Sequence, residues 1–113
     1  MTLPHNATAV IARNEIWQGR AASEPYECGW AHEAIVFVRA LDAPVKLARA
    51  KARIQISPDG MRWLDHGKPL ALPTKKDAVT ALGVTHFGGW LRVAVDLPKG
   101  TQIKVLVTIH LKA

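Results

Sequence analysis

The side chains that most often bind metals or carry out catalysis are scattered along this sequence. No two histidines have the i, i+4 spacing of a helical zinc site, and no cysteine–histidine pattern has the spacing of metal ligands. The five histidines are His5, His32, His66, His86 and His110. We therefore expect no metal site and no cofactor.

The sequence also lacks the local patterns of a catalytic nucleophile or a phosphate-binding loop. Ser23 and Ser57 stand outside any Gly-x-Ser-x-Gly motif, and the Ser57 hydroxyl is expected to bond local backbone in a turn. Gly88-Gly89 lacks the Lys-Ser/Thr ending of a P-loop. No acidic residue lies in an apolar run that would raise its pKa for acid catalysis. The sequence thus predicts a protein that is not an enzyme and has no catalytic residues.

A row of basic residues forms the first candidate binding site. Arg49, Lys51 and Arg53 alternate with apolar residues, so a strand would project them from one face at intervals of about 6.6 Å. This row is interpreted as a site for an acidic partner surface, and the alternative is a solvated face that keeps the sheet in solution. The net charge of +6 favours an acidic partner. Because no aromatic residue is interleaved, specific nucleic-acid binding is not expected.

The four tryptophans form the second set of candidates. Trp63 and Trp90 lie beside strands whose inward pattern would bury them. Trp17 and Trp30 stand next to polar loop sequence, where an exposed indole would provide a stacking platform for a glycan. Core packing is thus expected for the first pair, and glycan stacking stays an open alternative for the second.

Short β-branched apolar runs, and alternation of apolar and polar residues, predict the strands that would position these side chains. Residues 8–11 and 34–38 are predicted strands, and residues 48–56 alternate strictly. Ser57-Pro58-Asp59-Gly60 is a turn signal in which Gly60 takes a positive φ, and residues 61–64 are the expected returning strand.

The C-terminal quarter repeats this pattern most clearly. Residues 91–96 and 103–111 both alternate, and a Leu97-Pro98-Lys99-Gly100 turn separates them, so they are predicted to form a hairpin. Residues 66–89 follow no single period; loops are expected there, with one short strand or helical turn around residues 77–82, and the region is otherwise left unassigned.

Length and composition are those of one domain. The chain has 113 residues, of which 49% are hydrophobic, and the strands separated by proline and glycine turns predict an all-β fold. We expect a single antiparallel β-sandwich of jelly-roll type over residues 8–113, after a flexible N-terminal segment over residues 1–7. Cys28 is the single cysteine, so no intrachain disulfide is expected. No apolar run or leader pattern predicts membrane insertion or export.

Part of the sequence resembles a known group of proteins. The stretch ARIQISPDGMRW (residues 52–63), followed by residues 89–95 and the closing strand 103–111, resembles small β-sandwich virion proteins of tailed bacteriophages. The likeness covers about half of the chain, Ala52 to Ala113. The same hairpin is similar to discoidin-like carbohydrate-binding domains and to the sialidase Asp-box, although one residue of that box is missing between Asp59 and Trp63.

The resemblance implies a non-catalytic structural protein of a bacteriophage virion. It implies a capsid decoration, or cement, protein that binds the outer head surface through protein–protein contacts, as a homo-oligomer with a trimer favoured. Such a protein is assembled in the cytoplasm of the bacterial host; outside a virion, a cytoplasmic location is expected. No functional residue is carried over, because the shared motif describes a turn.

Three other functions stay open at this stage. One is another head- or tail-associated virion component. A second is a carbohydrate-binding module that uses Trp17 or Trp30. The third is a cupin-type enzyme, which requires several histidines and a carboxylate to converge on one metal ion.

Overall fold

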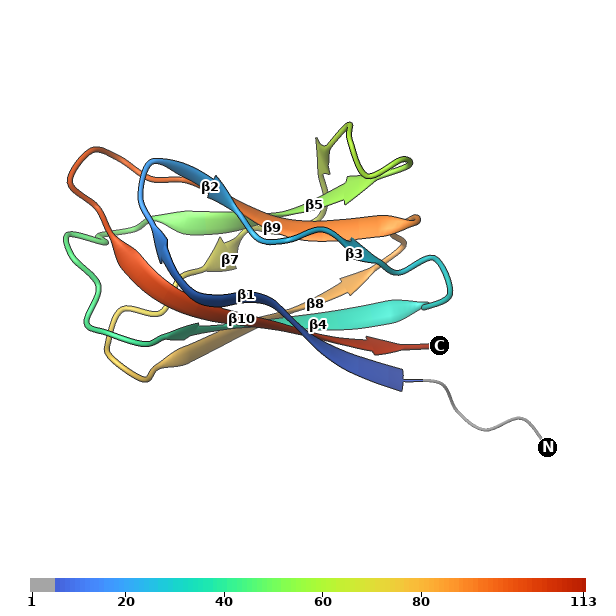
Figure 1. The fold of residues 1–113 in the computed structure, drawn as a ribbon, viewed down its shortest axis with the longest axis horizontal. Helices are drawn as coiled ribbons and strands as arrows, with labels where there is room; N and C mark the ends of the chain where they lie inside the picture. The colour runs from blue at the N-terminus through green and yellow to red at the C-terminus, as the bar shows by residue number, and fades with distance from the viewer. Residues whose placement is uncertain (1–5) are drawn as a thin grey trace.

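The computed structural model describes residues 6–113, and ten β-strands form two facing sheets there (Figure 1). The strands, in chain order, are β1 (Asn6–Trp17), β2 (Arg20–Ala22), β3 (Tyr26–Glu27), β4 (Glu33–Ala40), β5 (Lys51–Ser57), β6 (Leu64–Asp65), β7 (Leu70–Ala71), β8 (Val79–Thr85), β9 (Trp90–Asp96) and β10 (Ile103–Lys112).

The strand order is that of a jelly roll. The four-stranded sheet has the order β1-β10-β4-β8; the six-stranded sheet has the order β2-β9-β5-β6, with β3 paired to β9 and β7 paired to β5. Without the two-residue strands β3 and β7, the other eight strands are arranged 1-8-3-6 in one sheet and 2-7-4-5 in the other. This is the double Greek key of a jelly roll. All of these pairings are antiparallel, so the predicted all-β jelly-roll sandwich is confirmed.

The core lies between the two sheets and follows the alternation in the sequence. In β10 every second residue from Ile103 to Leu111 is buried, and β4 and β9 contribute their own alternate apolar side chains. Because the hydrophobic effect removes one face of each sheet from water, these strands are amphipathic with period two. Residues 6–113 contain no helix long and apolar enough to cross a membrane.

Strand β1 is longer than predicted. Asn6 and Ala7, expected in the flexible segment 1–7, pair with Lys112 and Leu111 of β10. The remainder of that segment, residues 1–5, lies outside the described residues. Two register shifts interrupt the pairing between Val10 and Glu15 and break the two-residue period. For this reason the second half of β1 carries no clear strand pattern in the sequence.

The prediction of a strand over residues 48–56 is wrong at its start. Strand β5 begins at Lys51, and the preceding residues form a turn in which the Ala50 amide donates to the Leu47 carbonyl at 3.0 Å. Lys46 and Ala48 both have φ of 50°, a left-handed conformation that a strand does not accommodate. Arg49 therefore lies in a turn and is not on the β5 face that carries Lys51 and Arg53.

The predicted C-terminal hairpin is also wrong. The segment 97–100 does connect two strands, but β9 pairs with β2, β3 and β5 while β10 pairs with β1 and β4. The two strands face each other across the core and do not lie side by side. Alternation shows that each strand has a buried face, and it does not distinguish a neighbour beside the strand from one opposite.

Two further segments differ from the sequence prediction. The strand that returns after the Ser57 turn is β6, at Leu64–Asp65, and not residues 61–64. The unassigned region 66–89 contains β7 and the edge strand β8.

Candidate functional site

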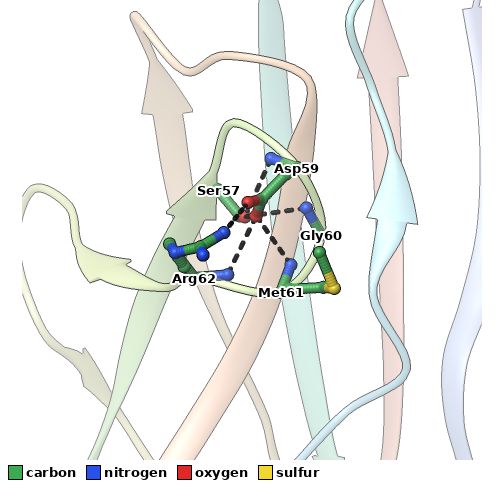
Figure 2. A network of polar contacts seen from close by, with 5 residues as sticks. All are labelled: Ser57, Asp59, Gly60, Met61 and Arg62. Carbon is green, nitrogen blue, oxygen red and sulfur yellow. Dashed lines mark hydrogen bonds and ion pairs between the residues drawn. The ribbon is translucent and has the colours of Figure 1, made fainter.

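The β5–β6 hairpin loop is held by a local network of hydrogen bonds (Figure 2). The Ser57 hydroxyl accepts from the Gly60 amide at 2.8 Å and from the Asp59 amide at 3.2 Å. The Asp59 carboxylate accepts from the Met61 and Arg62 amides, each at 2.9 Å, and from the Arg62 guanidinium at 2.7 Å. These backbone hydrogen bonds, with a contribution from Arg62, lower the pKa of Asp59 from 3.8 to about 2. The predicted local role of the Ser57 hydroxyl is confirmed.

Gly60 allows this loop to close against the sheet. Its φ of 79° is the predicted positive value. A β-carbon at this position would lie 3.3 Å from the Trp90 ring, so the glycine also lets the loop backbone approach the indole. The loop therefore covers part of Trp90 at one end of the six-stranded sheet.

The hairpin also brings Trp63 to an arginine of β9. The Arg92 guanidinium carbon lies 4.4 Å from the centroid of the Trp63 ring, which is cation–π geometry. Arg92 Nε donates to Gln55 Oε1 at 2.8 Å, and Gln55 Nε2 donates to Asp65 Oδ1 at 2.9 Å. Arg92 is thus fixed on the outer face of the six-stranded sheet by a ring and an amide, and it forms no ion pair with a carboxylate of residues 6–113.

Next to this network, the outer face contains a hollow of about 430 Å³ lined by three arginines. They are Arg20 of β2, Arg53 of β5 and Arg92 of β9. Ala22, Ala94 and Arg53 form one row across three neighbouring strands, because Ala94 pairs with Ala22 on one side and with Arg53 on the other. The two alanine side chains are too short to fill the space between the longer side chains around them, so they form the floor of the hollow. We call this site the arginine hollow.

Positive charge dominates the arginine hollow. Burial, and next to it the repulsion of the neighbouring Arg53 guanidinium, lower the pKa of Arg92, because both disfavour its charged form. Arg53 has one weak ion pair, with Asp65 at 3.6 Å and both side chains largely exposed. Arg20 forms no ion pair within residues 6–113. Asp96 is the acidic residue of the lining.

The structure separates the three basic residues that the sequence placed in one row. Arg53 lines the arginine hollow, Lys51 is exposed two residues earlier on the same strand, and Arg49 lies apart in its turn. Sequence reasoning missed Arg20 and Arg92. The alternation of β9 does place Arg92 outward, but only the strand order shows that β9 lies between β2 and β5.

The tryptophans are arranged differently from the prediction. Trp17, proposed as an exposed glycan platform, is 1% exposed in the core, because β1 continues through its bulges and pairs Trp17 with Ile103. Trp30, the other candidate, is 39% exposed. Trp63, in the β5–β6 loop, and Trp90, which this loop partly covers, are both half-buried and lie outside the hydrophobic core in which they were expected.

Other reactive groups provide no second site. Within residues 6–113, no three histidine, cysteine, aspartate or glutamate side chains group as metal ligands would. Cys28 is buried and its thiol donates to the Gly88 carbonyl at 3.4 Å. Burial raises the pKa of the Cys28 thiol to about 11, so it stays protonated at neutral pH.

Comparison with known proteins relates this chain to others by its fold. The structure is similar to the crystal structure of the SPBc2 prophage-derived protein YomS, with a TM-score of 0.65 and 8% sequence identity. The similarity covers 100% of this chain and 97% of that one. No protein-family model matches the sequence. No curated protein matches it either. The two chains therefore share a fold over their whole lengths, without recognisable sequence similarity.

Proposed function

We propose that this protein is a non-enzymatic structural component of a bacteriophage particle, and that it decorates the outer surface of the head. The observation that carries the proposal is the fold shared over the full chain with a prophage-derived protein. The virion-protein resemblance of residues 52–113 agrees with it and was found independently of the fold. A decoration protein would act through surface complementarity, which requires no catalytic residues.

The surface proposed for attachment is the outer face of the six-stranded sheet. It carries Lys51 and the arginine hollow on a protein with a net charge of +6. A cationic face of this kind is attracted to an acidic capsid surface and steers association toward it. We propose that copies also associate with one another, as a trimer, through the edge strands. Both β1 and β8 are edges of the four-stranded sheet, and they carry the exposed apolar residues Ile16 and Val79.

The proposal is tested by measuring solution mass and then particle binding. Light scattering of the purified chain is expected to give a discrete oligomer, and the protein is expected to co-sediment with phage heads that lack it. The double variant Lys51→Glu/Arg53→Glu should co-sediment at least about tenfold less well at low salt, because the attraction is electrostatic. The single variants Arg53→Glu and Arg49→Glu change the net charge equally, and Arg49→Glu should have the smaller effect because Arg49 lies outside the proposed face. A chain that is monomeric by light scattering and does not co-sediment with the particles would contradict the proposal.

The carbohydrate-binding alternative is weakened by the burial of Trp17. Of the two tryptophans suggested for stacking, Trp30 alone is exposed. Quenching of the tryptophan fluorescence by a glycan, together with absence of co-sedimentation, would favour this alternative.

A further inference from the structure

Two arginines of the arginine hollow lie beside the same short stretch of its floor. Ala94 stands at the centre of the floor, and Arg92 lies two residues away on the same strand face, about 7 Å along β9. Arg53 stands beside Ala94 on the neighbouring strand. The long side chains of Arg53 and Arg92 thus border the same short stretch of floor from two directions.

The guanidinium of Arg92 is oriented before any ligand arrives. One face contacts the Trp63 ring, and the Nε edge is occupied by Gln55. Within residues 6–113 the two terminal nitrogens of Arg92 form no ion pair, and Arg53 is held by a single weak one. A group that accepts hydrogen bonds from both arginines would offset their mutual repulsion.

The two acidic residues at the border limit what such a group can be. Asp65 stands beyond Gln55 in the row of Arg92, and Asp96 stands in the row of Arg20, so a negative charge lies at each end of the positive region. A polyanion laid across this face would pass one of these carboxylates, and the Trp63 ring beside the hollow already has Arg92 on one face. A single carboxylate fits between them, and it matches the fork geometry of guanidinium groups.

We infer that the arginine hollow binds one aspartate or glutamate carboxylate of a partner protein, which accepts hydrogen bonds from Arg53 and Arg92 over the floor formed by Ala22 and Ala94. Arg20 adds charge at the far side of the hollow. This inference rests on the proposed function, because it identifies the group on the acidic partner surface that the six-stranded sheet recognises.

The test uses the intact protein and a short capped peptide with two adjacent glutamates, and the matched glutamine peptide is the ligand control. Binding is followed by NMR, from the Nε–H signal of Arg92 and the indole N–H signal of Trp63, which report on the hollow itself. The glutamate peptide should move both signals, and the glutamine peptide should move neither. Arg53→Gln should weaken the affinity about tenfold, since a hydrogen-bonded charge is lost. Arg49→Gln should leave it within about twofold, as expected for an exposed charge away from the site.

Two further variants and two other anions are included as controls. Arg92→Lys keeps the charge and loses the fork, so it should weaken binding of the glutamate peptide. Arg20→Gln changes the hollow without touching the Trp63 stack and should have a smaller effect in the same direction. Inorganic phosphate and a short oligonucleotide are added in place of the peptide. If either binds the hollow more tightly than the glutamate peptide does, or if Arg49→Gln weakens binding as much as Arg53→Gln, the carboxylate assignment is wrong.

This experiment separates the inference from the function on which it rests. If the protein co-sediments with particles but the hollow does not bind the glutamate peptide, the ligand assignment is wrong and the proposed function stands. If the hollow binds the peptide but the protein does not co-sediment with particles, the proposed function is wrong and the carboxylate site stands.

Discussion

At the scale of the residue, Asp59 organises the loop that covers Trp90 and delivers Trp63 to Arg92. Its carboxylate accepts hydrogen bonds from two backbone amides and from the Arg62 guanidinium. The Ser57 hydroxyl accepts from the Asp59 and Gly60 amides. Such side-chain acceptors replace the ladder partners that a loop lacks. The loop that carries Trp63 to Arg92 is therefore held by hydrogen bonds to the Asp59 carboxylate.

The lowered pKa of Asp59 predicts when this loop loses its order. A carboxyl whose folded pKa is about 2 and whose ordinary value is 3.8 contributes its full stabilisation above pH 4, and loses it as the pH falls toward 2. The amide signals of Met61 and Arg62 in NMR should therefore stay constant down to about pH 3 and move below it. Asp59→Ala should move both signals at pH 7, whereas Asp77→Ala, at a distant turn, should not. A midpoint near pH 4 would contradict the proposed network.

At the scale of the element, a strand contributes to the free energy of unfolding through the apolar side chains that it buries. Strand β4 lies inside the four-stranded sheet between β10 and β8, whereas β8 is an edge. Val38 of β4 is 0% exposed and Val79 of β8 is 54% exposed, so the same substitution compares the two environments.

Val38→Ala should lower the free energy of unfolding by about 2–3 kcal/mol, because it removes two buried methyl groups and leaves a cavity. Val79→Ala should change it by less than about 0.5 kcal/mol, as is usual for exposed positions. Urea denaturation followed by tryptophan fluorescence measures both values. Similar losses for the two variants would mean that another copy of the chain covers the β8 edge.

At the scale of the whole molecule, the two ends of the sequence close the sandwich. Strands β1 (blue) and β10 (red) run side by side in Figure 1, and Asn6 pairs with Lys112. Strand β10 also pairs with β4, and its alternate residues supply a large share of the core. The fold is therefore completed by contacts between residues far apart in sequence, an arrangement typical of slow-folding β proteins.

Removal of residues 109–113 should abolish cooperative unfolding of the whole domain. The truncation takes away the β10 partners of Asn6 to Ala9 and of Glu33 to Val36, and it opens the core at Ile109 and Leu111. Removal of Ala113 alone, which lies beyond β10, should leave the melting temperature unchanged. Near-ultraviolet circular dichroism and calorimetry measure both effects. A truncated chain that still melts in one sharp transition would show that β10 is not required to hold the sheets together.

The sequence by itself determined the features that depend on neighbouring residues. Alternation predicted β9 and β10, because burial of one strand face has a period of two wherever the strand runs, and a short β-branched apolar run predicted β4. Turn chemistry predicted the Ser57 hydroxyl and the left-handed Gly60, since both are properties of four consecutive residues. The all-β sandwich follows from these strands and turns.

The tertiary structure alone decided which strands are neighbours, and therefore which side chains form the site. Alternation does not show whether β9 and β10 lie beside each other in one sheet or opposite each other in two. For this reason a hairpin was predicted where the chain crosses between the sheets. Bulges in β1 broke the period and hid the burial of Trp17. Arg20, Arg53 and Arg92 are distant in sequence, and the order β2-β9-β5 brings them to one hollow. Arg49 is only four residues from Arg53, and left-handed turns before β5 place it elsewhere.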